Sequence, residues 1–240
     1  MSNPTAAFLV IGDEILSGRT REANIQVLAT ALTGVGIDLT EIRVIRDGQT
    51  PIVAAVNELR ATYDHVFTSG GIGPTHDDVT ADSVAAAFGV GIDIRDDARE
   101  RIESLVRRRG IPMADGVLRM ARIPDGAALI GNRLSGAPGF SIGNVHVMAG
   151  VPSIFKVMVE DLVPTLDGGA PTVSESLIVE RGEAYFAEAL AEFARANEDL
   201  SIGSYPIQNE GRFVVEIVVR GTDPERVRAA VAELADVVRE

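Results

Sequence analysis

Short apolar runs and longer amphipathic segments follow one another along the first third of the chain. Each apolar run is bounded by glycine or polar residues and has the length of a buried strand. The segments between them carry apolar residues three or four positions apart, which predicts helices packed through one side. This alternation predicts an α/β fold, a three-layer, mostly parallel sheet with helices on both faces and ligands at the carboxyl ends of the strands. The expected strands are 6–11, 39–45 and 64–69, and the expected helices are 23–36, 50–63 and 80–88.

The middle of the chain has less regular patterns. A charged amphipathic helix is expected at 96–109, and its three terminal arginines are interpreted as a solvated face, with an anion site as the alternative. After Pro124, the short runs ALI, GFSI and VHVM are separated by glycine, asparagine and proline. These runs predict a β-ribbon that returns to the sheet.

A linker is predicted at 167–171, because its glycines and proline cannot continue a helix. It divides the chain into a first domain at 1–166 and a small α+β domain at 172–240. The pattern of the second domain predicts the order β-α-β-β-α and a small antiparallel sheet. Its hairpin turn is expected at 209–211, where the sequence reads NEG.

Composition narrows the classes of partner. With 22 Lys and Arg against 35 Asp and Glu, the net charge is −13, which repels nucleic acids and anionic membrane surfaces, so neither is expected as a partner. The chain has no cysteine, which excludes disulfides, thiolate metal sites and a cysteine nucleophile. The apolar run at 6–11 lacks a basic leader and no run reaches membrane-spanning length, so we expect a cytoplasmic protein.

The stretch TSGGIGPTHDD, residues 68–78, carries the clearest chemical signal. It ends an expected strand, turns on glycines and precedes an expected helix. Gly70, Gly71 and Gly73 lack a Cβ, so a phosphate can approach their N–H groups, and the helix N-terminus also favours an anion. The stretch therefore predicts a phosphate-binding loop. The alternative is a tight strand-to-helix turn with solvated aspartates.

Carboxylates are expected to converge at the same edge of the sheet. Asp77 and Asp78 close the loop and would repel a bare phosphate, while Asp13 and Glu14 follow the first expected strand and Asp47 the second. Crowded carboxylates need a proton or a cation, and their oxygens are ligands that Mg²⁺ prefers. The expected cofactor is a divalent metal, Mg²⁺ or a similar ion, bound by Asp13, Glu14, Asp77 and Asp78. The alternative is a set of ordinary turns.

Two small-residue turns follow the β-ribbon pattern. SGAPGF begins at Ser135 and AGVPS at Ala149, and both could pack a flat base or a ribose against the backbone. Turns that only shape a β-ribbon are the alternative. Arg133, just before the first turn, either binds a phosphate through its planar fork or is an exposed arginine.

The three histidines are too dispersed for a metal triad. His65 and His146 lie in expected strands, and a structural role is predicted for both. His76 lies inside the glycine-rich loop, next to the aspartates, where it could touch a ligand.

Four stretches together resemble one known family. TSGGIGPTHDD resembles the signature loop of the molybdopterin-binding fold, shared by the molybdenum-cofactor biosynthesis enzymes of the MoaB and Mog type and by the N-terminal domain of competence/damage-inducible protein A, CinA. VIGDEILSGRTREAN, SGAPGFSI and MAGVPSIFKVM match the CinA branch, and all four lie between about residues 6 and 165. The second domain resembles the accessory domain of stand-alone CinA-type proteins and of some two-domain FAD synthases.

The resemblance implies roles for residues in and near these stretches. Asp47 and Asp78 match family aspartates associated with catalysis and metal, so both are expected to be catalytic. The expected ligand-binding residues are Gly12, Asn24, Ser69, Gly70, Gly71, Gly73, Pro74, Thr75, Ser135, Gly136, Ala137, Pro138, Gly139, Gly150 and Pro152.

The function that the motifs and the resemblance favour is a metal-dependent nucleotide pyrophosphatase, which hydrolyses a nucleotide diphosphate such as ADP-ribose or FAD at the acidic loop. One alternative is a molybdopterin-binding protein or molybdopterin adenylyltransferase, and another is a non-catalytic nucleotide-binding protein. The expected partner is a small nucleotide or pterin. Self-association in the family implies a homo-oligomer, a dimer or a trimer.

Overall fold

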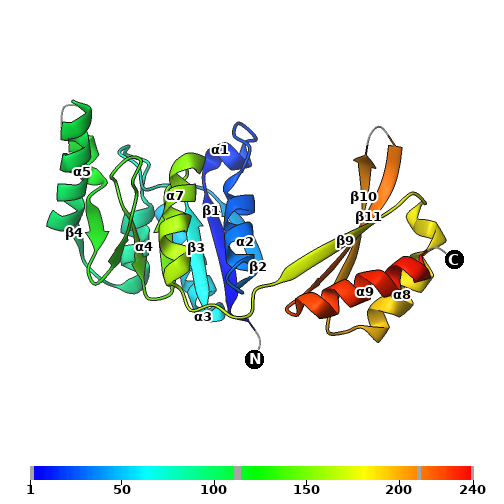
Figure 1. Ribbon diagram of the computed structural model, residues 1–240. Coiled ribbons are helices and arrows are strands. Elements are labelled where there is room, and N and C mark those ends of the chain that lie inside the picture. Colours follow the sequence, from blue (N-terminus) through cyan, green and yellow to red (C-terminus); the bar gives the residue numbers. More distant parts are fainter. Residues whose placement is uncertain (1–2, 111–114, 210–211, 239–240) are drawn as a thin grey trace. The chain divides into compact units, whose positions relative to one another are not determined.

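The computed structural model describes residues 3–110, 115–209 and 212–238, and its chain divides into two compact units (Figure 1). The first unit comprises residues 1–169 and the second residues 170–240. Each unit has its own hydrophobic core, and each is described by itself.

A six-stranded sheet forms the centre of the first unit, in the order β2-β1-β3-β8-β7-β6. The first four strands are parallel, whereas β7 and β6 run antiparallel to their neighbours, so the predicted mostly parallel sheet with a returning β-ribbon is confirmed. The strands are β1 (Thr5–Ile11), β2 (Asp38–Ile45), β3 (His65–Ser69), β6 (Ala128–Ile130), β7 (Gly139–Ile142) and β8 (Val145–Met148).

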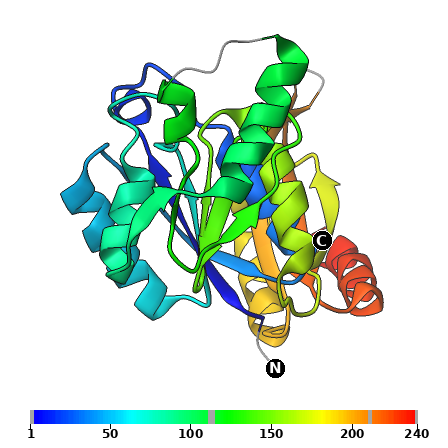
Figure 2. The same cartoon turned by 90° about the vertical axis from the view of Figure 1, so that its left-hand side faces the viewer.

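Helices cover both faces of this sheet, which gives the predicted three layers (Figures 1 and 2). Side chains of β1 alternate between two cores: Ala7, Leu9 and Ile11 pack on one face, and Phe8 and Val10 on the other. The first face carries α3 (Gln49–Thr62), α4 (Thr80–Phe88) and α5 (Asp96–Arg109), and the second carries α2 (Asn24–Thr33) and α7 (Pro152–Leu162).

Helix α7 is the main element that the sequence analysis missed. Pro152 occupies its first turn, where a missing N–H costs nothing, and Phe155, Met158 and Leu162 recur at helical spacing and are buried. The apolar pattern that predicts this helix is therefore present in the sequence. Smaller elements that were not predicted are α1 (Asp13–Leu16), β4 (Ile92–Ile94), α6 (Asp115–Arg119), β5 (Arg122–Pro124) and a 3-10 turn at Val163–Thr165.

The second unit has the predicted order of elements around an antiparallel sheet, β10-β11-β9. Val215, Ile217 and Val219 of the central strand are buried with Val227 and Leu234 of the last helix. Asn209 pairs with Arg212, and the residues of the expected turn, 210 and 211, lie outside the described residues. The elements are β9 (Val173–Val179), a 3-10 turn (Glu183–Tyr185), α8 (Ala187–Ala196), β10 (Ser201–Asn209), β11 (Arg212–Gly221) and α9 (Pro224–Val237). In the described part of the chain, every helix is too short or too polar to cross a lipid bilayer.

Two histidines form a partly buried pair within the main sheet. His65 Nδ1 lies 3.3 Å from His146 Nε2, and His146 Nδ1 lies 2.9 Å from Ser141 Oγ. The rings of both histidines also contact Phe67. Burial, with a smaller effect of His65, lowers the pKa of His146 to about 4, and burial also lowers the pKa of His65. These contacts agree with the predicted structural role.

The pair makes the first unit sensitive to acid. His146 takes up a proton near pH 6.5 when unfolded but near pH 4 when folded, so unfolding is accompanied by proton uptake in this window and stability falls as the pH falls through it. The expected loss attributable to His146 is on the order of 3 kcal/mol at most. Urea denaturation at pH 5 and pH 7, followed by circular dichroism, would measure it.

The matched control is His146→Asn, which keeps a polar side chain but does not titrate. Other acid-sensitive groups are common to both proteins, so the difference in free energy of unfolding between the two pH values should be smaller in the variant. An equal difference in both proteins would contradict the assignment to His146.

Candidate functional site

A cleft of about 530 Å³ lies where the parallel strands of the first unit end. Its walls come from the loops that follow β1, β2, β3 and β8, together with the turn between β6 and β7. This volume lies in the range of small-molecule sites, and the carboxyl edge of a parallel sheet is the usual place for one.

The glycine-rich loop forms one wall of the cleft. Gly70 and Gly71 have φ angles of 107° and 69°, a region that favours glycine. The carbonyl of Gly71 accepts a hydrogen bond from Thr80 N at 2.9 Å, which fixes the loop to the start of α4. Within residues 3–110, 115–209 and 212–238, the N–H groups of Gly71, Ile72 and Gly73 donate to no other group. The loop therefore presents consecutive N–H donors for an anion.

Thr75 and Asp78 close the far end of this loop. Asp78 Oδ2 accepts hydrogen bonds from the Thr75 backbone N–H, at 2.8 Å, and from the Thr75 hydroxyl. Asp78 N donates to the carbonyl of Thr75 at 3.3 Å. Asp78 therefore lines the cleft and also holds the loop in shape, while His76 is almost fully exposed beside Asp77.

Four of the five predicted carboxylates line the cleft: Glu14, Asp47, Asp77 and Asp78. Asp47 Oδ2 also accepts the N–H of Asp13 at 2.8 Å and thereby fixes the start of α1. The Asp13 side chain lies in a neighbouring hollow, where its Oδ1 is 3.0 Å from Arg46 Nε.

The carboxylates do not form a complete metal cage. No three acidic or histidine side chains of the described residues lie close enough together to hold an ion. Mg²⁺ usually keeps several waters and is held by one or two carboxylates plus substrate phosphates. The acidic side chains therefore fit an ion shared with a bound phosphate, and they do not fit an ion enclosed by protein alone.

Asn24 connects two of the loops that form the cleft, the glycine-rich loop that begins at the end of β3 and the one that follows β8. Its Nδ2 donates to Ser69 Oγ and to the carbonyl of Gly150, both at 2.8 Å, and the side chain is buried. Glu22 accepts the N–H groups of Asn24 and Ile25, which fixes the start of α2. Asn24 and Ser69 do not line the cleft, and they position the loops that do.

The turn at 132–137 forms the opposite wall. Asn132 Nδ2 donates to the carbonyl of Ala137 at 2.9 Å, and its Oδ1 accepts from the N–H of Ser135 at 3.1 Å. Arg133 pairs with Glu160 at 2.5 Å, which agrees with the interpretation of this arginine as a surface residue.

The expected ligand-binding residues separate into two groups. Those that line the cleft are Gly70, Gly71, Gly73, Pro74, Ser135, Ala137, Gly150 and Pro152. Those that do not line it are Gly12, Asn24, Ser69, Thr75, Gly136, Pro138 and Gly139.

The structure adds residues that the sequence analysis did not propose. Arg119 Nη2 donates to the backbone carbonyl of Asp78 at 3.3 Å, so a cation lies beside the acidic loop. The sequence gives no signal for this contact, because α6 and the loop meet only through the tertiary fold. Apolar side chains of the cleft that were also missed are Ile72, Met120, Ile154 and Met158.

Comparisons with known proteins cover both units. Residues 7–168 match a family described as a probable molybdopterin-binding domain, and residues 171–240 match the FAD synthase middle domain. A probable FAD synthase of Caenorhabditis elegans is 30% identical over 98% of this chain and 50% of its own length, so the chain spans about half of that relative. A protein of Archaeoglobus fulgidus is 30% identical over 96% of both chains.

Among solved structures, the protein CinA of Thermoplasma acidophilum, described as of unknown function, superposes with a TM-score of 0.59. It is 28% identical, and the match covers 65% of this chain and 94% of that protein. The predicted CinA-type resemblance is confirmed.

Proposed function

Since the chain belongs to the family of probable molybdopterin-binding domains and continues into a FAD synthase middle domain, we propose that its cleft binds a nucleotide diphosphate and hydrolyses the phosphoanhydride bond with a divalent metal. ADP-ribose and FAD are the substrates proposed first. The observation that carries this proposal is the presence of free N–H donors and acidic side chains in one cleft.

The loop supplies the phosphate contacts. N–H groups of Gly71, Ile72 and Gly73 would donate to phosphate oxygens, and the nearby N-terminus of α4 would add a favourable dipole. Arg119 beside Asp78 would offset part of the negative charge. The apolar side chains Ile72 and Met158 offer a surface against which a flat ring can pack.

The acidic side chains supply the remaining chemistry. Asp78 and Glu14 line the cleft and would hold a divalent metal together with the substrate phosphates. Such an ion neutralises charge on the phosphates and lowers the pKa of a bound water. Asp47, which also lines the cleft, is the proposed acceptor for the proton of the attacking water.

A pterin is the second candidate ligand, favoured by the family match and by the apolar wall of the cleft. In that case the protein would bind molybdopterin or transfer an adenylyl group to it. Thermal stabilisation by the pterin, without stabilisation by AMP or ADP-ribose, would favour this function over the first.

Hydrolysis is tested with ADP-ribose, FAD, NAD and ATP. Each compound is incubated with the whole chain and Mg²⁺, Mn²⁺ or Co²⁺, and a parallel series contains EDTA. The expected result is metal-dependent release of AMP from ADP-ribose or FAD. Binding of these compounds without any turnover would instead support a non-catalytic nucleotide-binding protein, and the proposal of a pyrophosphatase would be abandoned.

A further inference from the structure

A second cavity, of about 610 Å³, lies on the other side of the 132–137 turn. It is bounded by α5, by the segment that follows β6, and by the end of α7. Asn132 lines both this cavity and the cleft, whereas Ser135 faces the cleft and Gly136 faces the second cavity. The turn is therefore a thin partition between two spaces of similar size.

The partition is thin because Gly136 packs directly on α5. Its φ angle is 75°, and a Cβ placed on it would lie 2.9 Å from Leu105 Cβ and 3.1 Å from the carbonyl oxygen of Arg101. A larger residue would push the turn away from the helix, toward the cleft. The sequence analysis assigned Gly136 to ligand binding, and its position indicates that it sets the distance between the two spaces.

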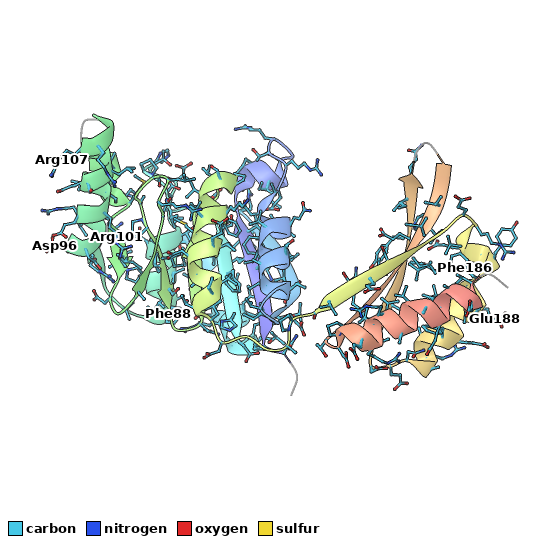
Figure 3. All side chains as sticks on the ribbon, viewed as in Figure 1. Phe88, Asp96, Arg101, Arg107, Phe186 and Glu188 are labelled. Carbon is cyan, nitrogen blue, oxygen red and sulfur yellow. The ribbon has the colours of Figure 1, made fainter. Side chains whose placement is uncertain are left out.

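The second cavity contains two arginines of α5 that form no ion pair within the described residues. Arg101 and Arg108 stand two helical turns apart on the same side of α5, and both line the cavity. Figure 3 shows Arg101 on the side of α5 that is turned toward the sheet, whereas Arg107 points away from it. No carboxylate of the described residues forms an ion pair with Arg101 or Arg108, although Glu100 also lines the cavity.

The third arginine of the cavity and one of its carboxylates are ion-paired. Arg133 pairs with Glu160, and Asp97 pairs with Arg95 at 2.6 Å. Asp161 accepts the N–H of Gly131 at 2.6 Å. Arg108 Nε donates to the carbonyl of Ser104 at 3.3 Å, which leaves its two terminal amino groups available. Together with Arg101 they could bind a ligand that carries a phosphate or several hydroxyls.

We propose that this cavity binds the distal half of a dinucleotide diphosphate whose first half occupies the cleft. The inference rests on the proposed function and adds where the second half of such a substrate binds. In this arrangement one phosphate lies at the glycine-rich loop. The ligand then crosses the partition at Asn132, and its distal half reaches Arg101 and Arg108. A mononucleotide such as AMP fills only the cleft.

The test compares two ligands on the whole chain with Mg²⁺, by calorimetric titration. AMP probes the cleft alone, and an ADP-ribose analogue with a methylene-bridged diphosphate, which resists hydrolysis, probes both spaces. In the double variant Arg101→Gln, Arg108→Gln, the analogue should bind about 10 to 50 times more weakly, while the affinity for AMP stays within about twofold. Arg107→Gln, on the opposite side of α5, should bind both ligands as the wild type does.

The outcomes separate this inference from the proposed function. If the wild type binds AMP and the double variant binds the analogue normally, the second cavity is not a ligand site and the proposed function is unaffected. An equal loss for AMP and the analogue would likewise overturn the inference. If the wild type binds neither ligand, both proposals are wrong. Unchanged thermal unfolding of the double variant excludes misfolding as the cause of a lost affinity.

Discussion

Replacing Asp78 with asparagine is expected to lower metal-dependent turnover by at least about 100-fold, because the loss of roughly 3 kcal/mol of charge stabilisation corresponds to about two orders of magnitude in rate. Asp78 lines the cleft at the end of the glycine-rich loop, where a carboxylate and the substrate phosphates would share the metal. An amide oxygen can still accept the N–H of Thr75, so the loop should keep its shape. Product release from ADP-ribose or FAD measures the effect.

Binding without metal gives an independent measure of the same charge. In EDTA, the carboxylate of Asp78 should repel a phosphate at the loop by roughly 1 kcal/mol in water. The Asp78→Asn variant lacks this charge, so it should bind AMP about fivefold more tightly than the wild type when no metal is present. Asp96→Asn is the matched control, since Asp96 is an exposed aspartate of α5 outside the cleft. Full turnover by Asp78→Asn would remove this residue from the catalytic site, whatever its effect on binding.

The sheet could be predicted because each strand shows as a short run of consecutive apolar residues, which can be seen without knowing any distant contact. Successive side chains of a strand point to opposite faces of the sheet. This alternation alone places Phe8 and Val10 in one core of the first unit, and Leu9 and Ile11 in the other. The glycine-rich loop could be found for a similar reason. Its strand, glycines and helix start are contiguous, so no distant contact is needed to see them.

The roles within the site depend on distant contacts, and these could not be predicted. Asn24 was expected to touch the ligand, but it is buried and holds Ser69 and Gly150, two positions far away in the chain. Arg119 reaches the carbonyl of Asp78 from a separate short helix. Gly136 lies between Ser135 and Ala137, which line the cleft, yet it packs on α5. A motif shows where the chain turns, and the packing of other elements decides which side of the turn meets a ligand.

Replacing Gly70 with alanine is expected to have the largest effect on stability. Its φ angle is 107°, and a Cβ built there would lie 2.1 Å from the carbonyl oxygen of Ile11. That oxygen belongs to the backbone at the end of β1, so it cannot rotate away as a side chain could. The strands β1 and β3 would have to separate at the edge that forms the cleft. We expect a loss of about 3 kcal/mol or more, or roughly 6 to 12 °C in the calorimetric melting temperature of this unit.

Gly89→Ala is the control that separates the clash from the backbone strain. Gly89 also has a positive φ angle, 66°, at the end of α4, but a Cβ there would meet no atom within 4 Å. Alanine at this position carries only the cost of the left-handed conformation, about 1 kcal/mol, or roughly 2 to 4 °C. Similar losses in the two variants would show that the contact with Ile11 relaxes at little cost. A much larger loss for Gly70→Ala, accompanied by weaker AMP binding, would show that this close approach of β1 and β3 shapes the cleft, which Gly70 lines.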